Sequence, residues 1–145
     1  MAHFAKVLNG RVLNVIIAEP ELFGPDSGWV DDSPGEWIQT SYNVEGGVYI
    51  DPETGKPAPN QEEEIAKQDG RQRKNYAAVG DEYHHDLDLF CRPKPYLSWI
   101  LNPNTGFYEP PVPKPQDGNG YIWDEETQSW ENITEEDEEV FYNGK

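Results

Sequence analysis

The 145-residue chain has one cysteine, Cys91, and one methionine, at its first position. A single cysteine cannot form an internal disulfide, so the fold depends on packing instead of covalent cross-links. Basic residues are scarce too: 11 Lys and Arg stand against 28 Asp and Glu, giving a formal net charge of −17. An acidic surface repels nucleic acids and anionic membranes, so we expect neither as a partner.

Long apolar runs are also missing. No segment approaches the ~18 apolar residues that a membrane span needs. The start of the chain, "MAHFAK", lacks the basic and apolar regions of a secretory signal. We therefore expect a protein that is made in a cytoplasm and stays soluble.

The composition that remains is rich in turn formers. Hydrophobic residues make up 35% of the chain, whereas glycine and proline contribute 13 each. This balance predicts a mainly β fold, an extended chain of β-hairpins with proline-rich linkers and at most one short helix. Aromatic residues, at 12%, supply much of the apolar content and bury large areas in thin structures.

The clearest local signal is Asn9-Gly10, which lies between the β-rich runs 4–8 and 11–18. Asn-Gly favours a type I′ turn, whose twist matches that of paired strands, and it predicts a hairpin. The stretch "EWIQTSYN" alternates like a further strand, with Trp37 and Tyr42 as anchors.

The only helical candidate is the stretch 60–80. Asn60 can cap a first turn rich in glutamate, but the apolar face is poor and Gly70 interrupts it. A short helix and an exposed linker both remain open. The basic residues at its far end are Arg71, Arg73 and Lys74, which either meet an acidic neighbour or lie in water.

A repeat accounts for many of the aromatic residues. "WILNPNTGFYEPP" and "YIWDEETQSWENI" share an aromatic–Asx–x–x–Thr–x–x–aromatic pattern, and "VYIDPETGKP" and "EYHHDLDLFCRPKP" are degenerate copies. An Asx side chain accepts a backbone N–H two residues on and starts a turn. Aromatic residues then meet across the hairpin.

These patterns divide the chain into four segments: an N-terminal hairpin region 1–59, a helix or linker 60–80, repeated aromatic hairpins with proline-rich spacers 81–133, and an acidic tail 134–145. Acidic tails are usually solvated. In this one, Val140, Phe141 and Tyr142 suggest a docking tip.

The most tempting metal cluster is His84-His85-Asp86. Adjacent residues on a strand point to opposite faces, so the pattern favours a polar turn over one shared ion. Asp86 and Asp88 resemble a fragment of a calcium loop but lack its spaced glycine and closing glutamate. We find no nucleophile elbow, phosphate loop or zinc spacing, and we expect no enzyme, catalytic residue, cofactor or metal.

Several stretches resemble small proteins of tailed bacteriophages, notably marine and cyanobacterial ones. They are "HFAKVLNGRVLNVIIAEPE", "GEWIQTSYN", "RKNYAAVGDEY", "PKPYLSW" and "YEPPVPKPQDGNGYIWDEETQSW". The likeness runs from Phe4 to about Ile133 and departs at His84-His85, where acidic turn residues are expected, and at Cys91, where an aliphatic is expected. Such proteins are commonly uncharacterised or called structural.

The resemblance implies a virion component. We expect a capsid decoration or cement protein on the head surface, which binds the major capsid protein and copies of itself. The alternative is a tail or tail-fibre component that binds tail proteins or a host surface glycan, and a third reading is a non-virion protein of the infected cell. The candidate structural and interface anchors are Trp37, Trp99, Tyr108, Tyr121, Trp123 and Trp130.

Overall fold

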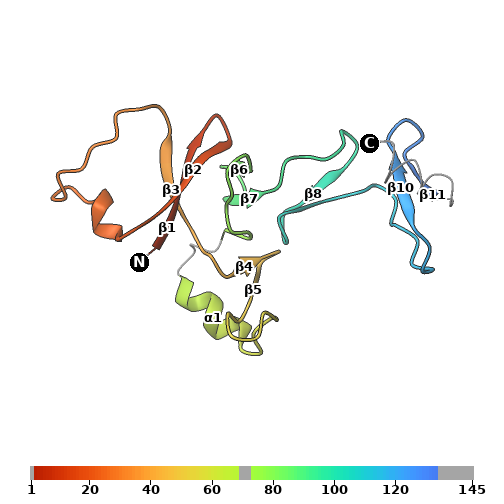
Figure 1. Ribbon diagram of the computed structural model, residues 1–145, viewed down its shortest axis with the longest axis horizontal. Helices are drawn as coiled ribbons and strands as arrows, with labels where there is room; N and C mark the ends of the chain where they lie inside the picture. Colours follow the sequence, from red (N-terminus) through yellow and green to blue (C-terminus); the bar gives the residue numbers. More distant parts are fainter. Residues whose placement is uncertain (1, 69–72, 134–145) are drawn as a thin grey trace, which may run out of the picture. The chain divides into compact units, whose positions relative to one another are not determined.

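The computed structural model describes residues 2–68 and 73–133 (Figure 1). Strands account for 36% and helices for 9%, with one α-helix in the described part of the chain, so the expected mainly β fold is confirmed. The elements are β1 (Ala2–Leu8), β2 (Arg11–Ala18), the 3₁₀ helix η1 (Pro20–Phe23), β3 (Glu36–Thr40), β4 (Val44–Glu45), β5 (Val48–Tyr49), α1 (Gln61–Gln68), β6 (Glu82–His84), β7 (Leu89–Cys91), β8 (Ile100–Asn102), β9 (Phe107–Glu109), β10 (Tyr121–Asp124) and β11 (Ser129–Asn132).

The N-terminal hairpin forms as its turn residues predict. β1 and β2 pair in antiparallel fashion along their length. Asn9 and Gly10 both have positive φ, 51° and 75°, which is the requirement of a type I′ turn. This part of the prediction is confirmed.

A five-stranded sheet grows outward from this hairpin in the order β3-β1-β2-β6-β7. β6 pairs with β2 through one register position, Arg11 opposite Glu82, and β7 forms the sheet edge. The buried apolar cluster on this sheet consists of Ala5, Val7, Val12, Ile38, Ala77, Tyr83 and Phe90. It is small, as the low hydrophobic content of the chain implies.

The stretch 60–80 resolves in favour of a short helix, α1, followed by irregular chain over residues 73–80. Gln61 joins this helix to β5. Its Nε2 donates to the carbonyl oxygens of Tyr49 and Ala58 at 2.7 and 2.8 Å, and its Oε1 accepts the Tyr49 N–H at 2.9 Å. A polar side chain therefore holds a helix whose apolar face is weak.

The repeat builds the turns that its Asx and Thr positions predict. Asp51, Asn102 and Asp124 each accept the backbone N–H two residues on, at 2.9, 2.9 and 3.0 Å. Thr54 and Thr105 do the same at 3.2 Å. The Asx hydrogen bond thus recurs in three separate parts of the chain, and the Thr hydrogen bond in two of them.

The chain divides into two compact units. The first comprises Met1–Pro93 and Leu101–Phe107, and the second comprises Lys94–Ile100 and Tyr108–Lys145. The first unit contains the five-stranded sheet, the β4–β5 hairpin and α1, and the second contains the β10–β11 hairpin.

Candidate functional site

Three tryptophans pack together in the second unit. Trp123 and Trp130 are register partners across the β10–β11 hairpin, and their ring centroids lie 5.1 Å apart. Trp99 closes the group at 5.9 Å from Trp123 and 6.2 Å from Trp130, and Tyr96 lies 5.6 Å from Trp99. We call Trp99, Trp123 and Trp130 the tryptophan clasp.

The indole N–H groups of the clasp differ in their partners. Trp123 Nε1 donates to Glu125 Oε1 at 2.9 Å, and Trp130 Nε1 donates to the Val112 carbonyl at 2.8 Å. Trp99 Nε1 is buried and has no hydrogen-bond partner within the described residues. A buried unpaired donor costs stability, so the packing of the Trp99 ring must compensate for it.

Glu125 ties the segment that carries Trp99 to the hairpin. Its carboxylate accepts the Ser98 N–H at 3.0 Å and the Ser98 hydroxyl at 2.6 Å. The hydrogen bond from the Ser98 hydroxyl, followed by that from the Trp123 indole, lowers the pKa of Glu125. The turn that looks purely polar in sequence therefore supplies the acceptor that assembles the clasp.

The other two predicted anchors of this unit have polar or cationic contacts. The Lys94 ammonium lies 5.9 Å from the Tyr108 ring centroid. Tyr121 donates its hydroxyl proton to Asp117 Oδ2 at 2.6 Å, and this bond raises the pKa of Tyr121.

The second unit also exposes large apolar side chains. We call them the exposed apolar set: Tyr96, Leu97, Ile100, Val112 and Ile122. Leu97 is 86% exposed and Ile100 is 67% exposed. Full burial of one such side chain against a partner would contribute about 1.5–3 kcal/mol to the free energy of binding.

Trp37, the remaining anchor, belongs to the first unit and is not part of the clasp. Its Nε1 donates to Asp31 Oδ2 at 2.9 Å, and its ring lies 5.8 Å from Phe23 and 6.1 Å from Trp29. The Lys6 ammonium also binds Asp31, at 2.6 Å, and this contact holds the pKa of Asp31 well below its usual range. Trp37 therefore fastens the long loop before β3 onto the sheet.

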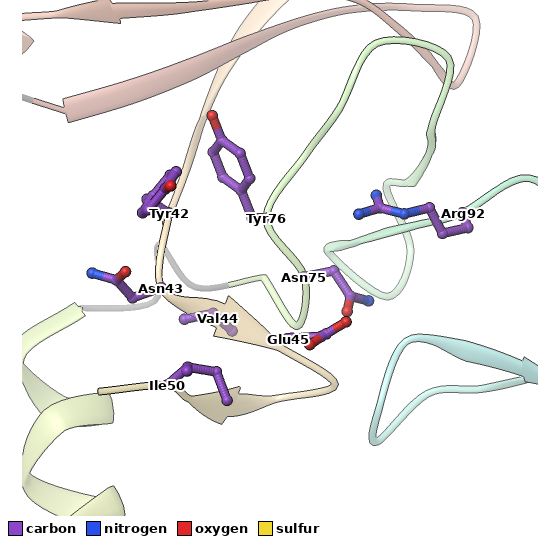
Figure 2. A pocket seen from close by; sticks show the side chains of 8 residues that line it. All are labelled: Tyr42, Asn43, Val44, Glu45, Ile50, Asn75, Tyr76 and Arg92. Atoms are coloured by element: carbon purple, nitrogen blue, oxygen red, sulfur yellow. The ribbon is translucent and has the colours of Figure 1, made fainter. Parts of the chain in front are cut away.

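A cleft of about 470 Å³ opens in the first unit (Figure 2). It is lined by Tyr42, Asn43, Val44, Glu45, Ile50, Asn75, Tyr76 and Arg92. The Tyr42 ring, on a side chain that is 63% exposed, stacks on His3 with centroids 5.4 Å apart and meets the edge of Tyr76 at 5.2 Å. Burial, and next the neighbouring Tyr42, raise the pKa of Tyr76.

The buried amide of this cleft is engaged within the protein. Asn75 accepts the Gly46 N–H at 2.8 Å and donates to the carbonyl oxygens of Phe90 and Gly106 at 2.8 and 3.0 Å. It thereby joins three segments that are distant in sequence: the β4–β5 turn, strand β7 and the β8–β9 turn. Nothing in its sequence neighbourhood signals this role, because none of the partners of its side-chain amide lies within ten residues of it.

Arg92, at the other side of the cleft, pairs with the carboxylate of Asp81. Asp81 is almost fully buried, and this burial raises its pKa, an effect that the guanidinium opposes. The cleft thus offers an aromatic pair, apolar side chains, the Glu45 carboxylate and the Arg92 guanidinium, which is paired with Asp81.

The two adjacent histidines do not form a shared metal site. His84 and His85 do not share a ligand position, because His84 binds Glu82 whereas His85 binds Glu36. The predicted docking tip at 140–142 lies outside the described residues, as does Arg71. Arg73 meets an acidic neighbour, donating to Asp88 Oδ1 at 2.8 Å.

Comparison with protein-family models, with curated proteins and with solved structures gives no significant match. The class of protein is therefore defined by the fold alone: the chain is a mainly β protein of two small units. Within the residues that the structure describes, no helix is long and apolar enough to cross a bilayer.

Proposed function

We propose that this chain is a structural protein of a tailed-phage virion and decorates the capsid as a cement protein. The observation that carries the proposal is the second unit, in which a packed tryptophan clasp holds a hairpin while five large apolar side chains remain exposed. Exposed apolar side chains mark a docking surface where they gather into one patch, and we propose that these five do. The resemblance of the sequence to small proteins of tailed phages is the reason for proposing a virion as the place where this docking occurs.

Weak contacts suffice for such a role when they are linked. Each compact unit has its own aromatic group, the clasp in the second and Trp37 with Phe23 and Trp29 in the first. Once one unit binds, its covalent connection to the other raises the effective concentration of that second unit to about the millimolar range. The partners that we propose are the major capsid protein and copies of this chain.

Charge complements this picture. The net charge of −17 favours association with a basic patch and speeds the encounter at low ionic strength. Attachment should therefore weaken as salt rises, with a larger effect on the association rate than on the dissociation rate.

The direct test is to image the parent particle by electron cryomicroscopy and to count copies by quantitative mass spectrometry. Density for this chain across the head lattice, at hundreds of copies per particle, is the expected result. Density confined to the tail would move the assignment to the alternative below, and absence from the particle would overturn both.

A second test separates docking from folding. The double variant Leu97→Ser/Ile100→Ser removes exposed side chains of the second unit, and Ile17→Ser/Val30→Ser removes side chains of matched exposure from the first. When purified protein is added back to depleted particles, the first variant should lose occupancy while the second retains it. Equal occupancy would show that the exposed apolar set does not dock.

One observation favours a tail component as the second candidate. Tyr42 presents an exposed ring at the mouth of the 470 Å³ cleft, and such a ring stacks on sugars. Binding of host surface glycans that is lost in Tyr42→Ala would support this alternative. The clasp is a poorer sugar platform, because Trp123 is only 5% exposed.

A further inference from the structure

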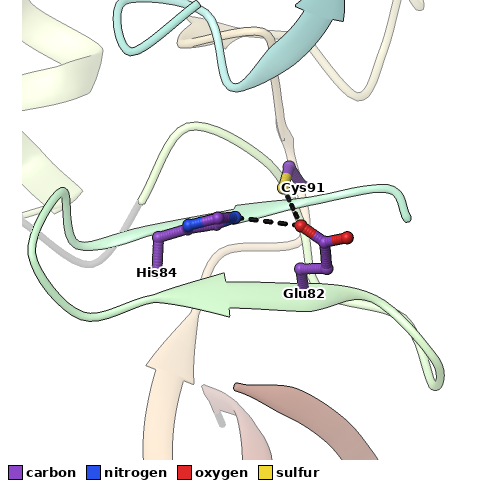
Figure 3. A group of neighbouring side chains, drawn as sticks. All are labelled: Glu82, His84 and Cys91. Carbon is purple, nitrogen blue, oxygen red and sulfur yellow. Dashed lines mark hydrogen bonds and ion pairs between the residues drawn. The ribbon is translucent and has the colours of Figure 1, made fainter. Parts of the chain in front are cut away.

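We propose that Glu82, His84 and Cys91 form a binding site for a divalent metal ion of the zinc type. The three side chains converge on one point between β6 and β7, as Figure 3 shows. This assignment departs from our sequence-based expectation of no metal, which considered His84 only together with His85 and Asp86.

Strand geometry explains the convergence. Glu82 and His84 are two residues apart on β6, so their side chains project from the same face. Cys91 is the register partner of Glu82 on β7 and lies on that face as well. His85, one position further along the chain, contacts Glu36 instead.

The distances suit a small ion. Glu82 Oε1 lies 3.0 Å from His84 Nε2 and 3.6 Å from Cys91 Sγ, and all three ligand atoms lie within 4.8 Å of one another. A point equidistant from atoms with these separations is about 1.8–2.4 Å from each, and zinc bonds to oxygen, nitrogen and sulfur measure about 2.0–2.3 Å. The site needs little rearrangement to accept the ion.

The chemistry of the donors selects the metal. A carboxylate, an imidazole and a thiolate together match the borderline-soft preference of Zn²⁺, whereas Mg²⁺ and Ca²⁺ take oxygen ligands. Without metal, the Cys91 thiol points its proton at Glu82 Oε1. Metal binding releases this proton to solvent. His84, whose Nε2–H donates to the Glu82 carboxylate without metal, must then carry its proton on Nδ1 so that Nε2 can donate its lone pair to the ion.

Three protein ligands would leave the fourth position of a tetrahedral zinc ion to water. Cys91 is fully buried, whereas the side chains of Glu82 and His84 are 15% and 30% exposed. Arg11 approaches the other carboxylate oxygen, Oε2, at 3.9 Å. The positive charge of Arg11 lowers the affinity of the site for a cation. Because Arg11 approaches Oε2, Glu82 Oε1 still faces His84 and Cys91.

The ion would link the two strands at one edge of the sheet. The β6–β7 hairpin has one register position with β2, Arg11 opposite Glu82, and the Tyr83 N–H donates to the Gly10 carbonyl beside it at 2.8 Å. A metal bound to both strands would hold this edge together in a chain that has no disulfide.

Cobalt titration of the metal-free full-length chain tests the proposal. Co²⁺ bound to the site should give a thiolate-to-cobalt charge-transfer band and strong visible bands of tetrahedral coordination, and Zn²⁺ should displace both. Zn²⁺ should also raise the melting temperature, because it binds the folded state. Absence of the charge-transfer band from the wild-type protein would overturn the proposal.

Matched variants identify the ligands. His84→Asn removes a proposed ligand and should weaken binding by more than about 100-fold, since even the loss of an outer-shell partner costs about 10–100-fold. His85→Asn is the same substitution one residue away and should bind Co²⁺ like the wild type. Cys91 is fully buried, so Cys91→Ser risks misfolding. The test of the metal site therefore rests on His84→Asn. Equal affinity of the two histidine variants, with native circular dichroism, would exclude the site.

Discussion

The indole rings of Trp123 and Trp130 meet across the β10–β11 hairpin with centroids 5.1 Å apart and planes inclined by 69°. This edge-to-face arrangement is favourable by about 0.5–1.5 kcal/mol beyond the buried area. An isolated two-stranded hairpin is marginal in water. Trp99, packed against both rings, supplies the additional burial that this hairpin needs.

Trp130→Ala should therefore unfold the second unit. Truncation of a fully buried large aromatic costs about 3–5 kcal/mol. Trp130 is half-buried, so we expect a loss near the lower end of that range, which is a large part of the stability of so small a unit. Amide hydrogen exchange should show lost protection in β10 and β11 while the β1–β2 hairpin stays protected. Ile122→Ala, on the other face of β10, is the control and should cost only about 0.5 kcal/mol. Comparable loss in both variants would show that the clasp is not special.

Asn75→Asp should destabilise the first unit by about 3 kcal/mol or more. The new carboxylate cannot donate to the carbonyl oxygens of Phe90 and Gly106, and each orphaned buried acceptor costs about 1–3 kcal/mol. Chemical denaturation measures the loss. Asn43→Asp makes the same change in a half-buried residue of the same cleft and should have a much smaller effect. A neutral Asn75 variant would contradict the joining role.

Acid should weaken the contact between Lys6 and Asp31. The Lys6 ammonium, and after it Ser33, lower the pKa of Asp31 from 3.8. The stability that Asp31 contributes is thus complete above its unfolded pKa and is lost as pH falls through the lower folded value. Guanidinium unfolding between about pH 6 and pH 2 should show a shallower pH dependence in Asp31→Asn than in the wild type. The exposed neighbour Asp32 gives the control, Asp32→Asn, whose profile should match the wild type.

Alkali should act on Tyr83. Burial, followed by the hydrogen bond to Asp88 at 2.5 Å, raises the pKa of Tyr83 to about 12. Its stabilising contribution is complete below the unfolded value of 10.0 and is lost as pH rises through the folded value. Tyr83→Phe should cost about 1.5–3 kcal/mol at neutral pH, because the bond is to a charged acceptor. It should also flatten the alkaline decline in stability. In Tyr96→Phe, which keeps an exposed ring, the free energy of unfolding at neutral pH should stay near the wild type.

The local turns were within reach of sequence reasoning, whereas the longer contacts were not. Asn9-Gly10 and the Asx residues of the repeat act on backbone groups no more than a few residues away, so their effect can be read from the order of residues. For the stretch 60–80, the sequence does not distinguish a short helix from an exposed linker. Its apolar face is weak, and it is held by Gln61, whose partner Tyr49 lies outside the helix.

Composition and turn chemistry therefore determined the mainly β class, the N-terminal hairpin and the turns of the repeat. The tertiary structure decided which side chains that are distant in sequence lie close together in space. Asn75 bonds groups from three segments distant in sequence, and Cys91 lies beside Glu82 and His84 only because β6 and β7 pair in one register. The physical reason is that a shift of one residue in a strand moves every side chain to the opposite face. That register depends on burial across the whole sheet, which no short stretch of sequence contains.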